Sequence, residues 1–399
     1  MTSNNNIPQG YKQTELGIIP EDWDTIKICE GLADVKSGKR LPYGYYVTDN
    51  RTKHPYIRVI DMYDGGIDTS NIMYVPEEAY KSIEKYRIFK DDIFISVAGT
   101  LGIVGKIPSW LDGANLTENA NRLTNITCCR DYLLYYLRSP YIQDVISSEQ
   151  TIGAQPKLAL NRIRNFEIAL PSSDTEQKAI ATALSDVDAL ISALDKKIAK
   201  KKIIKQGAMQ QLLTGKKRLQ GFTEEWVEKK LEEIADIYQP ITISQERFTI
   251  DGYNVYGANG IIGKYSDFNH VTDQVMVTCR GSSCGSINMS TGKSWITGNA
   301  MVLNMDKYNI CKQYVYYYLL NKDINDLITG SGQPQIVRKP LCEYKISIPH
   351  SINEQQAIAT ILSDMDKEIS DLENKRDKYN LIKQGMMQKL LTGQIRLRY

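Results

Sequence analysis

The residues EQKAIATALSDVDALISALDKKIAKKKIIKQGAMQQLLTGKKRL, at positions 176–219, occur a second time in the same chain. The second copy, at positions 354–397, reads EQQAIATILSDMDKEISDLENKRDKYNLIKQGMMQKLLTGQIRL. The copies are offset by 178 residues without a gap, and 27 of their 44 positions are identical. Self-similarity of this kind identifies an internal duplication. The chain therefore consists of two related halves.

Both copies have the apolar spacing of helices that pack along one narrow stripe. Apolar residues follow one another at intervals of four and three, the a/d pattern of a coiled coil. This helix-pair seam comprises Ile180, Leu184, Val187, Ile191 and Leu194 in the first copy, and Ile358, Leu362, Met365, Ile369 and Leu372 in the second. A helix over positions 176–213 would be about 57 Å long at ~1.5 Å per residue. We expect two such helices, paired antiparallel; the alternative is two helices in one ordinary core.

The seam changes character toward the end of each copy. It turns polar at equivalent positions, which are Lys201, Lys205, Tyr379 and Lys383. Apolar pairs stand beside the earlier columns at 203–204 and 381–382, so the apolar stripe rotates there. One face could serve the sister helix and the rotated face another protein. The lysine run at 196–205 is interpreted as a solvated helix face, with DNA or an acidic partner surface as alternatives.

Composition sets wide limits on the function. The 399 residues suffice for two to four domains, and 49 Lys and Arg nearly balance 47 Asp and Glu, so bulk charge indicates no particular partner. Neither a secretory leader nor an apolar run long enough to span a membrane is present, which favours a cytoplasmic protein. Seven cysteines without a CxxC pair are expected to be free thiols, and three scattered histidines argue against a zinc site.

The duplication extends beyond the helices. The short motifs that precede and follow Trp23 recur around Trp226, and the motif Thr-x-Asn-Ala at 117–120 recurs at 297–300. Short β-branched runs such as 93–97 and 275–278 indicate strands, and 132–137 and 314–319 indicate helices. Between these markers the two halves differ freely. We expect a mixed α/β (α+β) fold with globular domains at 1–173 and 221–351 and long helices at 174–220 and 352–399, related by an internal pseudo-two-fold.

This organisation resembles the specificity subunit of type I restriction–modification systems over nearly the whole chain. The motifs that carry the resemblance are TELGIIPEDW at 14–23, YGANGIIG at 256–263, and QGxMQxLLTG, which begins at both Gln206 and Gln384. The resemblance implies two target-recognition domains that each read one half of a bipartite site in double-stranded DNA. It also implies paired helices that set the spacing and bind two methyltransferase subunits, with a restriction/translocase subunit joining the full complex.

Electrostatics gives this expectation little support in bulk, because 11–171 carries 19 Lys and Arg against 21 Asp and Glu. We therefore expect the methyltransferase partners to supply much of the phosphate contact. Local clusters near glycine turns supply the DNA-binding candidates, since a guanidinium on a loop can pair with guanine. They are Lys36, Lys39, Arg40, Arg58, Tyr256, Asn259, Lys264, Arg280 and Arg338. Ordinary surface charge is the alternative for each.

No chemistry is expected in this chain. The segments 99–106 and 257–264 resemble phosphate loops but have Thr100 or Ala258 where glycine is required, and Ile107 or Tyr265 where a hydroxyl is required. An adenine-methyltransferase Asn/Asp-Pro-Pro-aromatic tetrad is missing from the sequence. The resemblance places S-adenosylmethionine on the methyltransferase partner, and ATP and magnesium on the nuclease partner. A cryptic enzyme and a coiled-coil scaffold without a DNA role are the rival interpretations.

Overall fold

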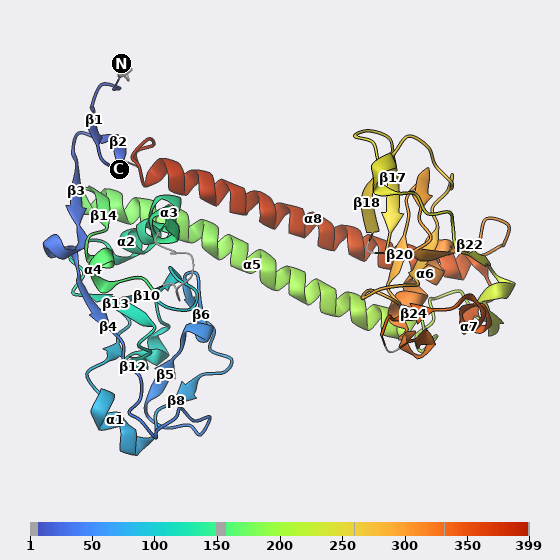
Figure 1. The fold of residues 1–399 in the computed structure, drawn as a ribbon, viewed down its shortest axis with the longest axis horizontal. Coiled ribbons are helices and arrows are strands. Elements are labelled where there is room, and N and C mark those ends of the chain that lie inside the picture. Colours follow the sequence, from blue (N-terminus) through green and yellow to red (C-terminus); the bar gives the residue numbers. More distant parts are fainter. Residues whose placement is uncertain (1–6, 149–156, 259, 331, 398–399) are drawn as a thin grey trace. The chain divides into compact units, whose positions relative to one another are not determined.

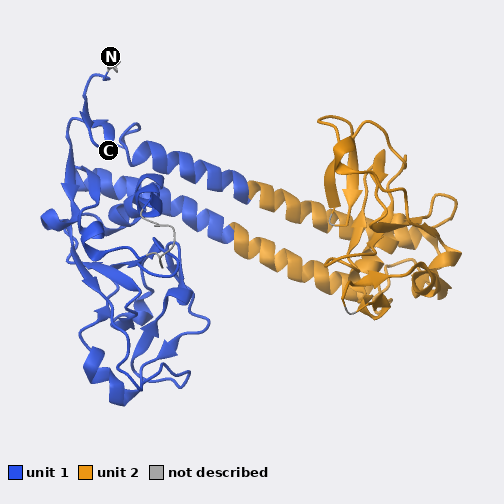
Figure 2. Cartoon of the chain, in the orientation of Figure 1, with its two compact units in different colours: residues 1–193, 376–399 blue, residues 194–375 orange. Residues whose placement is uncertain are grey.

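The structure is a computed structural model that describes residues 7–148, 157–258, 260–330 and 332–397 (Figure 1). The chain divides into two compact units. Unit 1 comprises Met1–Ala193 and Arg376–Tyr399, and unit 2 comprises Leu194–Lys375 (Figure 2). Each unit therefore contains one globular domain and a section of both long helices.

The two long helices are α5 (Asp174–Leu212) and α8 (Ile352–Leu390), each of 39 residues. Both begin where the sequence predicted, and α5 ends at Leu212, one residue before the predicted end at position 213. Gly215 and Gly393 each adopt a φ of +68°, a left-handed conformation that glycine takes without a steric penalty. Beyond the glycines the chain turns back, and the Lys217 and Ile395 amides each donate to a carbonyl six residues earlier, at 3.1 Å.

Ion pairs join α5 to α8 within each unit. In unit 2, Lys202 lies 2.7 Å from Glu373, and Lys205 lies 2.5 Å from Asp366. The partner number falls as the α5 number rises, so the helices are antiparallel. In unit 1, Lys383 lies 2.6 Å from Asp188. The paired antiparallel helices and the mixed α/β fold class are confirmed.

Unit 1 builds its globular domain around two four-stranded sheets. One has the order β11-β10-β13-β4, made of Val104–Gly105, Ile93–Ser96, Ala120–Thr124 and Asp34–Ser37, all antiparallel. The other has the order β8-β5-β12-β9, made of Met73–Tyr74, Pro55–Ile57, Ala114–Leu116 and Arg87–Ile88, with β5 and β12 parallel. The two-stranded pairs are β1 (Tyr11–Thr14) with β2 (Gly17–Pro20), β3 (Trp23–Lys27) with β14 (Glu167–Pro171), and β6 (Met62–Tyr63) with β7 (Gly66–Ile67).

Short helices complete unit 1. They are α1 (Glu77–Ile83), α2 (Arg130–Leu137), α3 (Pro140–Ser148) and α4 (Leu160–Arg164), with single turns η1 (Ile28–Leu32), η2 (Val59–Asp61) and η3 (Ser109–Leu111). Strand β5 ends at Ile57, because Arg58 starts a turn in which its backbone amide donates to the Asp61 carboxylate at 2.8 Å.

Unit 2 repeats this plan with fewer additions. Its main sheet has the order β20-β19-β22-β16, made of Ile287–Met289, Val275–Thr278, Ala300–Asn304 and Asp236–Tyr238. A second sheet has the order β18-β17-β21, made of Gly260–Tyr265, Tyr253–Gly257 and Ser294–Ile296. The pairs are β15 (Trp226–Lys230) with β25 (Lys345–Pro349), and β23 (Ile328–Thr329) with β24 (Gln335–Ile336). The helices are α6 (Lys312–Asn321) and α7 (Arg338–Glu343), with turns η4 (Leu231–Glu233), η5 (Gln245–Arg247) and η6 (Asn325–Leu327).

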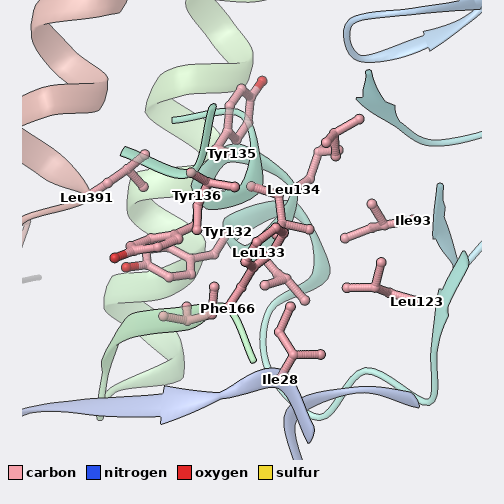
Figure 3. Packing of buried hydrophobic residues seen from close by; sticks show 14 of the residues in the cluster. Ile28, Ile93, Leu123, Tyr132, Leu133, Leu134, Tyr135, Tyr136, Phe166 and Leu391 are labelled. Carbon is pink, nitrogen blue, oxygen red and sulfur yellow. The ribbon is translucent and has the colours of Figure 1, made fainter. Parts of the chain in front are cut away.

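The main core of each unit joins its globular domain to the long helices. In unit 1, Tyr132 and Leu133 of α2 are fully buried in one cluster with Ile28, Phe166 and Leu391, which directly follows α8 (Figure 3). The equivalent core of unit 2 contains Tyr314 and Val315 of α6 together with Met209 and Leu212 of α5 and the following Leu213. The globular domains are therefore packed on the helices through a shared hydrophobic core.

The beginning of each helix seam belongs to these cores. Ile180 and Leu184 lie in the core of unit 1, and Ile358 and Leu362 lie in that of unit 2. Further along, Leu194 and Ile369 are buried, and four seam residues are partly buried, namely Val187, Ile191, Met365 and Leu372. The seam thus has two uses: its first turns hold the globular domain, and later positions line the helix pair.

Candidate nucleic-acid interface

Three of the DNA-binding candidates lie together at the end of β4. Lys36 is exposed and lies 3.5 Å from Asp34. The Lys39 ammonium stands 5.8 Å from the centre of the Tyr86 ring. Arg40 lies 2.6 Å from Glu118, yet 77% of its side chain remains exposed. These cations are accessible to a phosphate or a base edge.

Arg58 is committed to its own domain. Its guanidinium donates to both carboxylate oxygens of Asp61, at 3.0 and 2.6 Å, and to the carbonyl of Asn71 at 2.9 Å. The hydrogen bonds to Asp61 raise the pKa of Arg58 above its ordinary value. This geometry gives Arg58 a structural role in the turn that follows β5.

The candidates of unit 2 have different environments. Tyr256 is buried in the core, where its hydroxyl lies 3.0 Å from that of Thr291, so its side chain packs inside the domain. Lys264 and Arg280 are exposed, on β18 and just after β19. Arg338 is exposed but donates through Nε to the carbonyl of Ile237 at 2.6 Å. The remaining candidate, Asn259, lies outside the described residues.

A charged network in unit 1 connects the globular domain to both long helices. Asp188 of α5 accepts hydrogen bonds from the Tyr135 hydroxyl at 2.9 Å and from Arg138 at 3.2 Å, and Lys383 of α8 lies 2.6 Å away. Arg138 also donates to both oxygens of Asp64, at 2.8 and 2.6 Å. Burial alone would raise the pKa of Asp188, but the hydrogen bond from Lys383 and the charges of Lys383 and Arg138 lower it below its ordinary value.

Unit 2 repeats the central part of this network. Asp366 of α8 accepts a hydrogen bond from the Tyr317 hydroxyl at 2.8 Å and from Lys205 of α5 at 2.5 Å. The position equivalent to Arg138 is Leu320, so the additional arginine is specific to unit 1. The sequence contained a signal for the network, because Asp188, Lys205 and Tyr135 each recur in the second half, but their mutual contact was not predicted.

A second contact that occurs in both units pairs an arginine with a buried glutamate beside a tryptophan. In unit 2, Arg218 forms a two-pronged pair with Glu354 at 2.6 and 2.7 Å and lies over the Trp226 ring. In unit 1, Arg396 makes the same pair with Glu176 at 2.5 and 2.6 Å and lies over Trp23. The Glu354 side chain is completely buried and that of Glu176 nearly so. Burial of a carboxylate is tolerated here because the guanidinium fork pairs with both oxygens.

The repeated QGxMQ motif lines a groove in each unit. In unit 1, Gln384, Met387 and Gln388 of α8 face Tyr136 and Tyr141 across a groove of ≈ 750 Å³. In unit 2, Gln206, Met209 and Gln210 of α5 line a groove of ≈ 430 Å³ with Leu320 and Asn321 at the end of α6. The two grooves occupy equivalent places and differ in the residues on the domain side.

Next to these grooves, each unit leaves an apolar pair exposed. Ile203 and Ile204 of α5 are 73% and 45% exposed in unit 2. Their counterparts in unit 1, Leu381 and Ile382 of α8, are 69% and 39% exposed. These exposed apolar pairs recur at equivalent positions, which makes them candidates for contact with a protein.

The described residues contain no group of three or more His, Cys, Asp or Glu side chains placed to hold a metal ion. Within the same residues, no helix is both long and apolar enough to cross a membrane. All seven cysteines are described and free, as expected. Burial raises the pKa of the Cys279 thiol, which keeps it protonated and unreactive.

Two similar α/β domains on an antiparallel helix pair define a class of protein that presents two related but different surfaces. Comparison with known proteins identifies the class. The family model "Type I restriction modification DNA specificity domain" matches twice, at residues 20–203 and 223–384. The chain belongs to this family, and it is a DNA sequence-recognition subunit of the type I restriction–modification kind.

Individual relatives agree along the whole chain. The putative type I restriction enzyme MjaX specificity subunit of Methanocaldococcus jannaschii is 26% identical, over 98% of this chain and 97% of its own length. The MjaVIII specificity subunit of the same organism is 24% identical with the same coverage. The crystal structure of the S subunit from M. genitalium is similar in fold, with a TM-score of 0.66 at 21% identity and 98% coverage of both chains.

Proposed function

We propose that the two globular domains each read one half of an asymmetric bipartite site in double-stranded DNA. The observation that carries this proposal is the repetition of one strand order on different surfaces. Sheets β11-β10-β13-β4 and β20-β19-β22-β16 correspond strand by strand, while the exposed side chains around them differ. Domains with the same fold dock on DNA in the same way, and different surfaces select different bases.

The helix pair sets the distance between the half-sites and binds two methyltransferase subunits, one on each unit. The two equivalent grooves and the two exposed apolar pairs support this role, because they supply one protein-binding surface per unit. Two copies of one partner fit two copies of one surface. A restriction/translocase subunit joins the full complex through these partners.

The chain performs recognition without catalysis. The methyltransferase carries S-adenosylmethionine, the nuclease partner carries ATP and magnesium, and the assembly works in the cytoplasm. The tyrosines and carboxylates in the repeated networks are all engaged in contacts that hold the fold together. DNA recognition therefore falls to the exposed side chains of the two domains.

Domain exchange combined with methylome sequencing tests the proposal. The wild-type gene with its methyltransferase should produce one bipartite methylated motif in a host that otherwise lacks it. Replacing residues 231–344 by the equivalent segment of a relative leaves β15 and β25 in place and should alter one half of the motif only. Exchange of the unit 1 segment should alter the other half.

Three outcomes contradict parts of this proposal. Alteration of both halves or neither half by one exchange would contradict independent reading. Methylation by the purified chain without its partner would favour the rival interpretation of an enzyme. An assembled complex that shows no preference for any DNA sequence would favour a scaffold role.

A further inference from the structure

The connection between β4 and β5, residues 38–54, has a base at 38–40 that is hydrogen-bonded to the rest of the domain and an exposed tip at 43–46. At the base, the amides of Gly38 and Lys39 donate to the carbonyls of Ala120 and Leu116 at 3.0 and 2.9 Å. The Tyr56 hydroxyl donates to the Lys39 carbonyl at 3.1 Å, and Arg40 pairs with Glu118 at 2.6 Å. The base of the connection is therefore fixed to the β12–β13 turn of its own domain.

The tip projects large aromatic side chains into solvent. Tyr43 is fully exposed, Tyr46 is 82% exposed and Tyr45 is 43% exposed. Gly44 separates them with a φ of +89°, and a Cβ there would meet nothing within 4 Å. A hollow of ≈ 350 Å³ lies between the tip and the base, lined by Arg40, Glu118 and the tyrosines. Three exposed tyrosines on one short turn form an apolar surface of the kind that binding sites present.

The equivalent connection in unit 2, residues 239–252 between β16 and β17, has the same design with different residues. Its base is held on Gly298, the counterpart of Glu118. Gln239 donates to the Gly298 carbonyl at 3.1 Å, and the Gly298 amide donates to the Thr242 hydroxyl at 3.2 Å. Its large exposed apolar side chains are Ile241 and Ile250, at 78% and 94%.

The β4–β5 and β16–β17 connections expose apolar side chains at equivalent places in both units, which distinguishes them from exposed aromatic residues such as Tyr63 and Trp110. Tyr63 of unit 1 lies on the β6–β7 hairpin and Trp110 on η3, and the described part of unit 2 has no equivalent of either element. The connections are exposed in both units, rigid at the base in both, and unlike in sequence. A protein that reads two different half-sites with one fold needs elements with these three properties.

We propose that residues 38–54 form the base-reading element of unit 1, with Tyr43, Tyr46 and Arg40 as its contacting side chains, and that 239–252 is its counterpart in unit 2. The ligand is the base edges of one duplex half-site. Arg40 offers a planar donor pair for guanine, and the tyrosine rings and hydroxyls offer apolar and hydrogen-bonding contacts to neighbouring bases. In unit 2, the isoleucines offer contacts suited to thymine methyl groups. This inference rests on the proposed function and names the element that performs it.

The experiment uses the chain assembled with its methyltransferase subunits. The motif is first taken from the wild-type methylome, and binding is then measured to three duplexes: the intact motif, and the motif with either half-site scrambled. The double variant Tyr43→Ala/Tyr46→Ala should lose about tenfold or more of its discrimination at one half-site, since contacts to base edges carry the discrimination. Discrimination at the other half-site should be unchanged. The variant Ile241→Ala/Ile250→Ala should show the opposite pattern.

Two controls make the result specific. Trp110→Ala removes a comparably exposed aromatic residue of the same domain and should leave discrimination at both half-sites intact. Tyr43→Phe/Tyr46→Phe retains the rings and should keep more of the discrimination than the alanine variant. Normal assembly of each variant, measured by native mass, shows that the domain is folded.

Three results would overturn the inference: unchanged discrimination in the alanine variants, an equal loss in Trp110→Ala, or an equal fall in affinity for intact and scrambled duplexes, which would mean contact with phosphates alone. If the wild-type complex itself methylates no bipartite motif, the proposed function fails. A clear wild-type motif with unaffected variants contradicts only the assignment of the reading element.

Discussion

Lys383 of α8 lies 2.6 Å from Asp188 of α5 in unit 1, and the same pair recurs in unit 2 as Lys205 with Asp366 at 2.5 Å. In both units, the carboxylate also accepts a hydrogen bond from a tyrosine on the helix that packs the recognition domain. One carboxylate thus joins three elements, namely both long helices and the reading domain. The repeated network makes the position of each domain on the helices a specified feature of the fold.

Removal of the Asp188 carboxylate should weaken this junction. Asp188→Ala would leave the Lys383 ammonium and one side of Arg138 without their partner, and the Arg138 side chain is only 5% exposed. We expect a loss of about 1–3 kcal/mol in the free energy of unfolding. Asp186→Ala, on the exposed face of the same helix, is the matched control. Equal thermal unfolding midpoints for the two variants would contradict a stabilising role.

The same carboxylate should make stability depend on pH. Burial acts to raise the pKa of Asp188, but Lys383 and Arg138 lower it overall, so its folded-state pKa lies below the unfolded value near 4. The Asp188 charge therefore contributes to the free energy of unfolding above the unfolded-state pKa. That contribution is lost as the pH falls through the folded-state pKa. Between pH 5 and pH 3, the unfolding midpoint of the wild type should fall further than that of Asp188→Asn. Parallel curves would show that the charge contributes nothing.

The buried pair in unit 2 offers a larger effect. Arg218→Ala would leave the completely buried Glu354 carboxylate without its guanidinium. Because Arg218 itself is 28% exposed, we expect a cost of about 2–4 kcal/mol, toward the lower end for broken buried pairs. Arg218→Lys should recover part of it, since an ammonium retains the charge but not the fork. Lys217→Ala replaces an exposed neighbour and should leave the free energy of unfolding in urea unchanged. A loss as large as that of Arg218→Ala would contradict a specific role for the Arg218–Glu354 pair.

The exposed apolar pairs predict the stoichiometry of assembly. Ile203→Asp should reduce methyltransferase binding at unit 2, and Leu381→Asp should reduce it at unit 1, because a charge in an apolar interface is left desolvated and unpaired. Native mass measurements should show one bound methyltransferase for each single variant and none for the double variant. Leu190→Asp is the control, because the position equivalent to Leu190 in the second half is Glu368. An apolar residue at this position is therefore not part of the repeated surface. Two bound partners in the double variant would refute this docking surface.

Helix length should set the spacer between the half-sites. Both α5 and α8 pass from one unit to the other, at 193/194 and 375/376. Inserting seven residues at both places keeps the a/d register and adds about 10 Å to each helix. The methylome should then show the same half-sites with a spacer about three base pairs longer. An unchanged spacer would assign the ruler to the methyltransferase subunits.

Sequence alone determined the duplication, the two long helices and the class of the protein. Those features depend on local periodicity and repeated words, such as the a/d seam from Ile180 to Leu194, which the chain expresses without reference to its fold. The ends of the helices were also readable, because the left-handed glycines Gly215 and Gly393 follow the last leucines.

The tertiary structure decided which charges and aromatics are available. Arg58 and Arg40 look alike in sequence, but Arg58 is bound by Asp61 and Asn71 whereas Arg40 stays largely exposed. Tyr256 and Tyr43 both lie next to glycine, but one is in the core and the other in solvent. These outcomes depend on residues brought together from distant parts of the chain. Burial and pairing are properties of the folded surroundings, so local pattern does not contain them.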